Sequence, residues 1–417
     1  MVLERMTDAF VLGGVRTPVG RYGGSLSHIR VDDLLGQAMV WACERVHVPL
    51  ERIEDIVAGC VNPAHEGMGD IARWAALAAG FPDSVPAITV NRFCASSLSG
   101  AISIAHAIRS DELTVGLAAG VESMSRSGWA LMKGEAPFSP RGPVFMLDTM
   151  WAGAGGPPNP ALLARNAYIE MMQTAQNVAD RYELTREEID AFALRSHHHA
   201  AAARDSGRLA KEIHPVEIPA TRTQPARTFE HDESIRADTS AEKLAALPAQ
   251  PNTTQMTAGN SSPLNDGASA VVLASAAAAQ ELGAEPLARV VSSATHALDP
   301  QVMGIAPAFA IPKALARAGL APAVVDVWEV HEAYASVAVA ILRELPRQLD
   351  GFEIPDERLN PNGGAVAIGH PFGSSGTRYV LTLATELRER EARYGVLGVC
   401  VGSGQGVALV LENPRVA

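Results

Sequence analysis

The chain has 417 residues, of which 47% are hydrophobic, which is enough for two or three domains with buried cores. Its formal net charge of −12 argues against a nucleic-acid surface, because such a surface needs clustered basic residues to neutralise phosphates. No uncharged run is long enough to span a bilayer and no secretion signal is visible, so we expect a cytoplasmic protein without a membrane span. The 4 cysteines are too widely spaced for a disulfide framework, so each is expected to be a core thiol or a reactive one.

The first segments alternate between strand-like and helix-like patterns. Residues 9–12 predict a strand that ends at a turn formed by Gly13 and Gly14. Residues 31–46 then predict a helix, and residues 53–59 predict a buried strand. This alternation favours an α/β architecture.

A strand predicted at residues 87–90 runs into Cys94, and an apolar helix follows to residue 108. A thiol at the N-terminus of a helix feels the positive end of the helix dipole, which lowers its pKa and favours the thiolate. On position alone, a buried structural cysteine is an equally good interpretation. The next strand is predicted at residues 114–118, with Gly120 just beyond it.

The stretch from residue 125 to residue 252 differs from its surroundings. It contains a Gly/Pro-rich segment at 153–158, two amphipathic helices at 174–182 and 186–206, and a polar tract at 221–238. This composition predicts an inserted lobe that covers a site, rather than a third sheet with its own core.

Several histidines and cysteines are expected to be structural. The three consecutive histidines at 197–199 cannot share one face of a helix, so we interpret them as a solvated helix surface and predict no metal site. Cys43 and Cys60 lie in apolar segments and are expected to be core thiols.

The C-terminal part repeats the order of the N-terminal segments. A helix at 310–318 and a strand at 325–330 correspond to the first helix and the buried strand that follows it. His370 then precedes a Ser/Gly-rich helix and a strand at 396–401, much as Cys94 precedes its own helix and strand. The common order and spacing indicate an ancestral duplication of one α/β unit.

Three residues of this C-terminal part lie at positions suited to chemistry. His370 lies in a Gly-rich bend and can serve as a general base toward a thiol, although a surface-loop histidine is the alternative. An apolar strand delivers Cys400 to a Gly-rich turn whose backbone N–H groups can form an oxyanion hole. A phosphate-binding interpretation of these glycines is weaker, because a strand-like segment follows them instead of a helix. His331 and Glu332 follow a predicted strand, and open α/β sheets bind ligands at such strand ends.

Taken together, these motifs resemble those of the thiolases. The matching segments, in chain order, are RTPVG at 16–20, NRFC at 91–94, GVESMS at 120–125, TAGNSS at 257–262, NGG at 362–364 with GHP at 369–371, and CVGSGQG at 400–406. The resemblance implies the thiolase fold, in which two duplicated βαβαβαββ halves form a five-layer α-β-α-β-α core with an inserted loop domain. It implies an N-terminal half at 1–124 that continues at about 253–283, a loop domain covering the CoA site at 125–252, and a C-terminal half at 284–417.

The resemblance also implies a reaction. The enzyme would be an acyltransferase that cleaves a 3-oxoacyl-CoA with CoA as co-substrate, without a permanently bound cofactor or a metal. Cys94 corresponds to the nucleophile that carries the acyl group, His370 to its general base, and Cys400 to the acid and base that serves the enolate carbon. His331 corresponds to the site of the enolate oxygen, and the N–H groups of Cys94 and Gly402 to the oxyanion hole.

Five further positions correspond to contacts with CoA or with the acyl group. The resemblance places Arg236 near the nucleotide portion of CoA, and Ala258 and Ser262 along the pantetheine arm. Met171 and Tyr334 are expected to line the substrate site.

Two departures from the family pattern bear on the substrate. Many biosynthetic members have Asn where this chain has His331, and a His there resembles the β-oxidation type. Acetoacetyl-type members show His-Met-Gly where this chain has the segment 170–177, which lacks both the His and the Gly. The expectation is therefore a degradative thiolase that acts as a homodimer or homotetramer, with a hydratase/dehydrogenase partner subunit as a further option. The alternatives are a biosynthetic acetoacetyl-CoA thiolase and a thiolase-fold assembly subunit or lipid-carrier-like relative without catalysis.

Overall fold

The structure is a computed structural model that describes residues 8–63, 65–131, 146–150, 158–220, 222 and 225–416. Most of the predicted Gly/Pro-rich segment and part of the predicted polar tract lie outside the described residues. Within the described part of the chain, no helix is long and apolar enough to cross a membrane.

A large mixed sheet consists of two half-sheets that meet edge to edge. The N-terminal half-sheet contains β1 (Ala9–Arg16), β2 (Gly20–Arg21), β3 (Asp55–Gly59), β4 (Ala87–Val90), β5 (Val115–Ser123) and β10 (Asn265–Ser275). The C-terminal half-sheet contains β11 (Ala288–Ala297), β12 (Val327–Val330), β13 (Tyr394–Val401) and β14 (Gln405–Glu412). The halves join through a short antiparallel contact between β1 and β11.

The strand order is mirrored about this junction. Outward from β1, the strands follow in the order β10, β5 and β3. β1 pairs with β10 and β10 with β5 in antiparallel fashion, whereas β5 and β3 are parallel. Outward from β11 the partners are β14, β13 and β12, with the same three kinds of pairing. Two half-sheets with one common pairing pattern are what a duplicated α/β unit produces.

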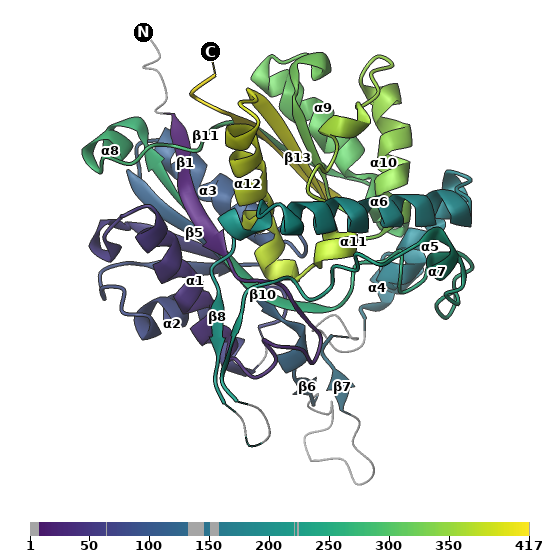
Figure 1. Cartoon of the computed structure of the whole chain (residues 1–417), viewed down its shortest axis with the longest axis horizontal. Helices are drawn as coiled ribbons and strands as arrows, with labels where there is room; N and C mark the ends of the chain where they lie inside the picture. The colour runs from purple at the N-terminus through teal and green to yellow at the C-terminus, as the bar shows by residue number, and fades with distance from the viewer. Residues whose placement is uncertain are drawn as a thin grey trace.

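Helices form three layers around the two half-sheets (Figure 1). On the outer side of the N-terminal half lie α1 (Val31–Arg45) and α2 (Ile71–Ala78), and on the outer side of the C-terminal half lie α9 (Pro307–Ala318) and α10 (Ala335–Gln348). Between the halves lie α3 (Ser96–Arg109) and α12 (Phe372–Glu389), which contact each other. The predicted core thiols Cys43 and Cys60 are buried in the N-terminal half. The α-β-α-β-α order confirms the predicted five-layer thiolase fold.

The two central helices approach each other so closely that their backbones touch. A Cβ atom added to Gly376 would lie 2.1 Å from the backbone nitrogen of Leu98. The N-terminal end of α12 also lies against β5, where a Cβ atom added to Gly120 would lie 2.1 Å from the carbonyl oxygen of Gly373. The hydroxyl of Ser97 accepts a hydrogen bond from the N–H of Thr377 at 3.0 Å. Glycine is needed at this crossing because any side chain would force the helices apart.

The predicted turn at Gly13 and Gly14 was wrong, because β1 continues through both residues to Arg16. The register of β1 against β10 shifts between Val11 and Gly13, so the two glycines lie at a bulge within the sheet. A Cβ on Gly14 would lie 2.2 Å from the carbonyl oxygen of Ala270. Glycine here allows a close approach between strands instead of reversing the chain.

The remaining elements surround the two halves. They are β6 (Trp129–Ala130), β7 (Leu147–Asp148), α4 (Pro160–Ala164), α5 (Met171–Arg181), α6 (Arg186–Asp205), β8 (Val216–Ile218), β9 (Arg227–Phe229), α7 (Ala241–Ala245), α8 (Ala276–Glu281) and α11 (Ala365–Ile368). The core of the C-terminal half includes side chains of α5 and α6, whereas the β8–β9 ribbon packs into the core of the N-terminal half. Figure 1 shows α6 running across the face of the molecule beside α12.

A buried cation at the end of β1 ties this surrounding segment to the halves. Both terminal nitrogens of Arg16 donate to Asp232, at 2.7 and 2.9 Å, and its Nε donates to Glu212 at 3.3 Å. Glu212 also accepts from the hydroxyl of Thr382 on α12, at 2.8 Å. The side chains of Arg16 and both carboxylates are almost fully buried, so each charge depends on its partners.

We predict that Arg16→Met lowers the free energy of unfolding by about 3–5 kcal/mol, because it leaves two buried carboxylates short of a partner. Urea unfolding followed by circular dichroism measures this change. Arg52→Met is the matched control, since Arg52 pairs with Glu281 at the surface. Equal unfolding midpoints for the two variants would show that the buried network does not hold the segment in place.

Candidate active site

Cys94 lies in a tight turn between β4 and α3. Phe93, just before it, has a φ of 45°, in the left-handed region that side chains rarely adopt. The N–H and the hydroxyl of Ser96 both donate to the carbonyl of Phe93, at 3.0 and 2.6 Å. The N–H of Arg92 donates to the same hydroxyl at 2.9 Å. These bonds hold Cys94, half-buried, just ahead of the first residue of α3.

His370 occupies the bend between α11 and α12. Its N–H donates to Oδ1 of Asn265 at 2.9 Å. The preceding Gly369 has a φ of 114°, and a Cβ there would lie 2.6 Å from the same oxygen. The Nδ1 atom of His370 lies 2.7 Å from Oγ of Ser375, whose hydroxyl lies 2.9 Å from the carbonyl oxygen of Pro371. A Ser375 hydroxyl that donates to Pro371 has a lone pair left for Nδ1, and this pattern corresponds to the tautomer with the proton on Nδ1 and a lone pair at Nε2 of His370.

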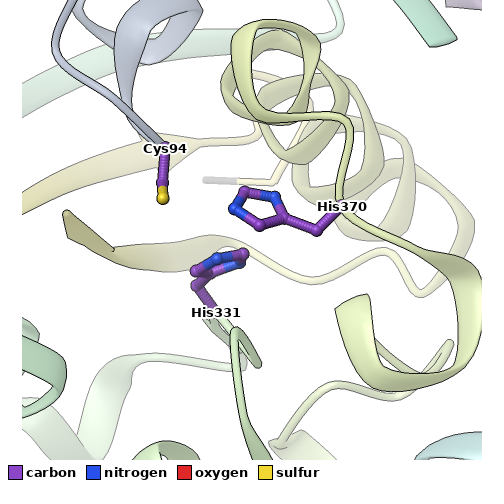
Figure 2. A group of neighbouring side chains, drawn as sticks. All are labelled: Cys94, His331 and His370. Carbon is purple, nitrogen blue, oxygen red and sulfur yellow. The ribbon is translucent and has the colours of Figure 1, made fainter. Parts of the chain in front are cut away.

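His331 follows β12 and faces His370 and Cys94. Its N–H donates to the carbonyl of Gly398 in β13 at 2.9 Å, and its Nδ1 lies 3.1 Å from the phenol oxygen of Tyr379. The two imidazole rings lie 4.3 Å apart between centroids. The sulfur of Cys94 and one nitrogen of each ring lie within 4.8 Å of one another, and Figure 2 shows the three side chains converging from separate segments. Neither Nε2 atom has a hydrogen-bond partner among the described residues.

Burial sets the protonation states of these three groups. It raises the pKa of Cys94 to about 11, against the opposing hydrogen bond from the N–H of Gly402. The expected lowering of this pKa was therefore wrong, because desolvation of the thiolate outweighs the backbone hydrogen bonds from Gly402 and Cys94. Burial and Arg378 lower the pKa of His370 to about 3, and burial with His370 and Arg378 lowers that of His331. At neutral pH the resting site therefore holds a thiol and two neutral imidazoles.

The structure brings three more predicted residues to this group. Cys400 is buried in β13, and burial and Cys94 raise the pKa of its thiol well above the usual value. Gly402 follows the same strand and donates its backbone N–H to the sulfur of Cys94. Tyr334 is half-buried at the start of α10, and its pKa is raised by burial and by its closeness to Cys94 and Cys400.

The other predicted contact residues lie around this group. Ser262 is half-buried and donates its N–H to the carbonyl of Ala333, at 3.1 Å. Met171 packs against the core of the C-terminal half at the start of α5. Ala258 and Arg236 are exposed, and the described contacts do not connect either of them to the group around Cys94.

Two predictions about nearby polar residues were wrong. Glu332 turns away from His331 into the interior, where it accepts hydrogen bonds from the hydroxyl of Ser196 at 2.6 Å and the amide of Asn360 at 2.7 Å. Of the histidines predicted to form a solvated helix surface, His198 is exposed but His197 is buried. The ring of His197 accepts a hydrogen bond from the N–H of Arg236 at 3.2 Å. Burial and the charge of Arg236 lower the pKa of His197 to about 4. The 3.6-residue period of α6 explains why neighbouring histidines differ.

Two residues that position the histidines were missed from the sequence. Ser375 and Tyr379 each lie beside the Nδ1 atom of one histidine, and both belong to α12. They are four residues apart, so they occupy one face of that helix. That spacing was a usable signal, but nothing in the sequence shows that this face of α12 points toward the histidines.

The arrangement can move a proton and stabilise negative charge. Cys94 is a half-buried thiol, a ring nitrogen of His370 lies within 4.8 Å of its sulfur, and the N–H of Gly402 points at the same sulfur. The same sulfur and two imidazoles are also the kind of ligands that a soft divalent ion binds. A thiol with a neighbouring base and a backbone donor defines a cysteine-dependent acyl-transfer site.

Comparison with known proteins names the family. Models of the thiolase N-terminal and C-terminal domains match residues 9–277 and 284–413. A β-ketoadipyl-CoA thiolase of Pseudomonas aeruginosa is 43% identical over 97% of this chain and 99% of its own. A 3-oxoadipyl-CoA/3-oxo-5,6-dehydrosuberyl-CoA thiolase of Escherichia coli K12 is 40% identical over 98% of this chain and all of its own. Human mitochondrial 3-ketoacyl-CoA thiolase in complex with CoA superimposes with a TM-score of 0.88 at 33% identity, covering 98% of each chain. The chain belongs to the thiolase family.

We predict that alkylation of Cys94 by iodoacetamide accelerates without a plateau between pH 7 and pH 10, by about tenfold per unit, because only the thiolate reacts. The midpoint is expected near pH 11, where burial places the pKa of this thiol. Peptide mass spectrometry follows Cys94 separately from the other cysteines. A rate that levels off by pH 8 would show that the pKa of Cys94 is lowered, as its position at the start of a helix predicts, and not raised by burial.

Proposed function

We propose that the protein is a degradative 3-oxoacyl-CoA thiolase, an acetyl-CoA C-acyltransferase that uses CoA to release acetyl-CoA and a shortened acyl-CoA. The observation that carries the proposal is the convergence of the Cys94 sulfur with one ring nitrogen of His370 and one of His331, in a site where neither Nε2 atom has a hydrogen-bond partner among the described residues. Membership in the thiolase family supports it. No permanently bound cofactor or metal is needed for the steps below.

The first step forms the acyl-enzyme. His370 accepts the proton of Cys94 at Nε2 as the sulfur attacks the 3-oxo carbon, so that a free thiolate need not form in the buried site. The N–H groups of Cys94 and Gly402 bind the oxygen of the tetrahedral intermediate, and such a donor contributes about 3–4 kcal/mol. Collapse of the intermediate breaks the C2–C3 bond and leaves the enolate of acetyl-CoA. The N–H groups at Nε2 of His331 and of protonated His370 bind the enolate oxygen.

The second half of the reaction returns the site to its starting state. Cys400 protonates the enolate carbon, and its raised pKa keeps it in the protonated form that this requires. CoA then binds and gives its thiol proton to the Cys400 thiolate. The CoA thiolate attacks the acyl-thioester, and the departing sulfur of Cys94 recovers its proton from His370. All protons are accounted for within the site.

The segment 125–252 is proposed to act as the loop domain that covers CoA, between an N-terminal half at 1–124 and 253–283 and a C-terminal half at 284–417. Arg236 would bind the nucleotide portion, with Ala258 and Ser262 along the pantetheine arm and Met171 and Tyr334 beside the acyl group. The exposure of Arg236 and the position of Tyr334 beside both thiols support these assignments. A cytoplasmic homodimer or homotetramer, with or without a hydratase/dehydrogenase partner, remains part of the proposal.

We expect Cys94→Ser to abolish acyl-enzyme formation and to lower the thiolysis rate by roughly 10⁴-fold or more, since the nucleophile is lost. Intact-protein mass spectrometry after mixing with a 3-oxoacyl-CoA detects the acyl group. Cys43→Ala is the control, because Cys43 is buried in the N-terminal half and should leave acylation intact. An acyl adduct on the Cys94→Ser variant would overturn the assignment.

The acyl group is proposed to be that of a 3-oxo-dicarboxylic acid, because two relatives at 40% and 43% identity are thiolases of such esters. We expect a higher kcat/KM for thiolysis of 3-oxoadipyl-CoA than for acetoacetyl-CoA or an uncharged 3-oxoacyl-CoA of equal length. A coupled assay across the three esters measures this order. Activity on acetoacetyl-CoA alone would instead favour the biosynthetic enzyme.

A further inference from the structure

Among the described residues, the ring of His331 has one hydrogen-bond partner, which is Tyr379. The phenol oxygen lies 3.1 Å from Nδ1, and the two rings meet nearly edge to face, with an angle of 86° between their planes. Tyr379 is fully buried on α12, and the opposite nitrogen of His331, Nε2, has no partner among the described residues. The orientation of the single phenol proton therefore decides which nitrogen of His331 is a donor.

The phenol proton of Tyr379 has one acceptor within reach. The contact with Nδ1 of His331 is the one hydrogen bond that the phenol makes among the described residues, so a phenol that accepted from Nδ1 would leave its own buried proton without a partner. The guanidinium carbon of Arg378 lies over the face of the Tyr379 ring, 3.9 Å from its centroid, and it offers no acceptor because a guanidinium only donates. Burial, with Glu332 and Glu329, raises the pKa of Tyr379, so the phenol keeps its proton. The remaining partner for that proton is Nδ1 of His331.

We propose that Tyr379 is a positioning residue that holds His331 in the tautomer with its proton on Nε2, so that a preset N–H donor faces the enolate oxygen of the acetyl-CoA leaving group. Because burial keeps His331 neutral, its ring has one proton, and a nitrogen that accepts from Tyr379 cannot hold it. The role in catalysis rests on the proposed function, whereas the tautomer belongs to the resting protein and can be measured without substrate.

The two histidines then carry their ring proton on opposite nitrogens. His370 donates from Nδ1 to Ser375 and presents a lone pair at Nε2, whereas His331 accepts at Nδ1 from Tyr379 and presents a proton at Nε2. Their centroids are only 4.3 Å apart, so two residues of the same type face one small space with different roles. One is ready to accept the thiol proton, and the other is ready to donate to an oxygen. The difference arises from their partners on α12.

The first test is Tyr379→Phe, which keeps the ring and removes the proton. We expect kcat for thiolysis to fall by roughly 10- to 100-fold, somewhat less than the loss of an entire oxyanion-hole donor, while KM changes little. Exchange of labelled CoA into an acyl-CoA needs only the acyl transfer at Cys94 and no enolate, so its rate should remain near that of the unmodified protein. Tyr182→Phe, which removes a phenol bonded to Glu344, is the matched control and should alter neither rate.

The second test separates positioning from packing. An asparagine at position 331 carries its own amide donor and has no tautomer to set, so Tyr379→Phe should lower kcat much less in the His331→Asn background than in the unmodified protein. An equal loss in both backgrounds would show that Tyr379 acts by packing alone and would overturn the proposal. A parallel loss of CoA exchange would do the same.

The third measurement reads the tautomer directly. Ring ¹⁵N NMR of the histidine-labelled protein, with His331 assigned from its loss in His331→Asn, should show the proton on Nε2, and Tyr379→Phe should shift the population toward Nδ1. A proton found on Nδ1 in the unmodified protein would refute the proposed tautomer. Failure of the protein to cleave any 3-oxoacyl-CoA would refute the proposed function instead and would leave this NMR result to stand by itself.

Discussion

The site depends on a backbone contact between two helices that only glycine allows. Where α3 and α12 cross, a Cβ on Gly376 would lie 2.1 Å from the nitrogen of Leu98. Cys94 lies two residues before the start of α3 and His370 lies two residues before the start of α12, so the close approach of the two helices also brings these two side chains together. Larger residues at the crossing would separate the helices and with them the thiol from its proposed base.

This crossing also joins the two halves of the chain. Cys94 comes from the N-terminal half, whereas His331, His370 and Cys400 come from the C-terminal half, and all of them converge at the central layer. The N–H of Gly373 on α12 donates to Glu122 at the end of β5, which gives a second link across the same boundary. A site divided in this way exists only when both halves are folded and docked, because neither half contains both the proposed nucleophile Cys94 and its proposed base His370.

Docking of the two halves also buries the site, and this loss of water sets the protonation states of its thiol and imidazoles. A thiol with a pKa near 11 beside an imidazole with a pKa near 3 does not ionise in the resting state, because the buried ion pair would cost too much. In the proposed reaction, the proton is transferred as the sulfur bonds to carbon, when the charge moves to an oxygen held by the N–H of Gly402. Ser375 and Tyr379 complete the proposed site, because their contacts with Nδ1 set the tautomers in which His370 presents a lone pair and His331 presents an N–H at Nε2.

Much of the fold and the main residues of the candidate site could be predicted from the sequence. Short patterns of apolar and small residues place the strands, the helices and the duplication, and local motifs single out Cys94, His370, Cys400 and His331, because these features depend on neighbours along the chain. The tertiary structure alone decided that Glu332 turns inward, that Gly14 lies within a strand, that burial raises the pKa of Cys94 instead of lowering it, and that Tyr379 meets His331. These outcomes depend on desolvation and on partners that are distant in the sequence, such as Ala270 beside Gly14, more than 250 residues away. A local sequence pattern contains no information about such partners.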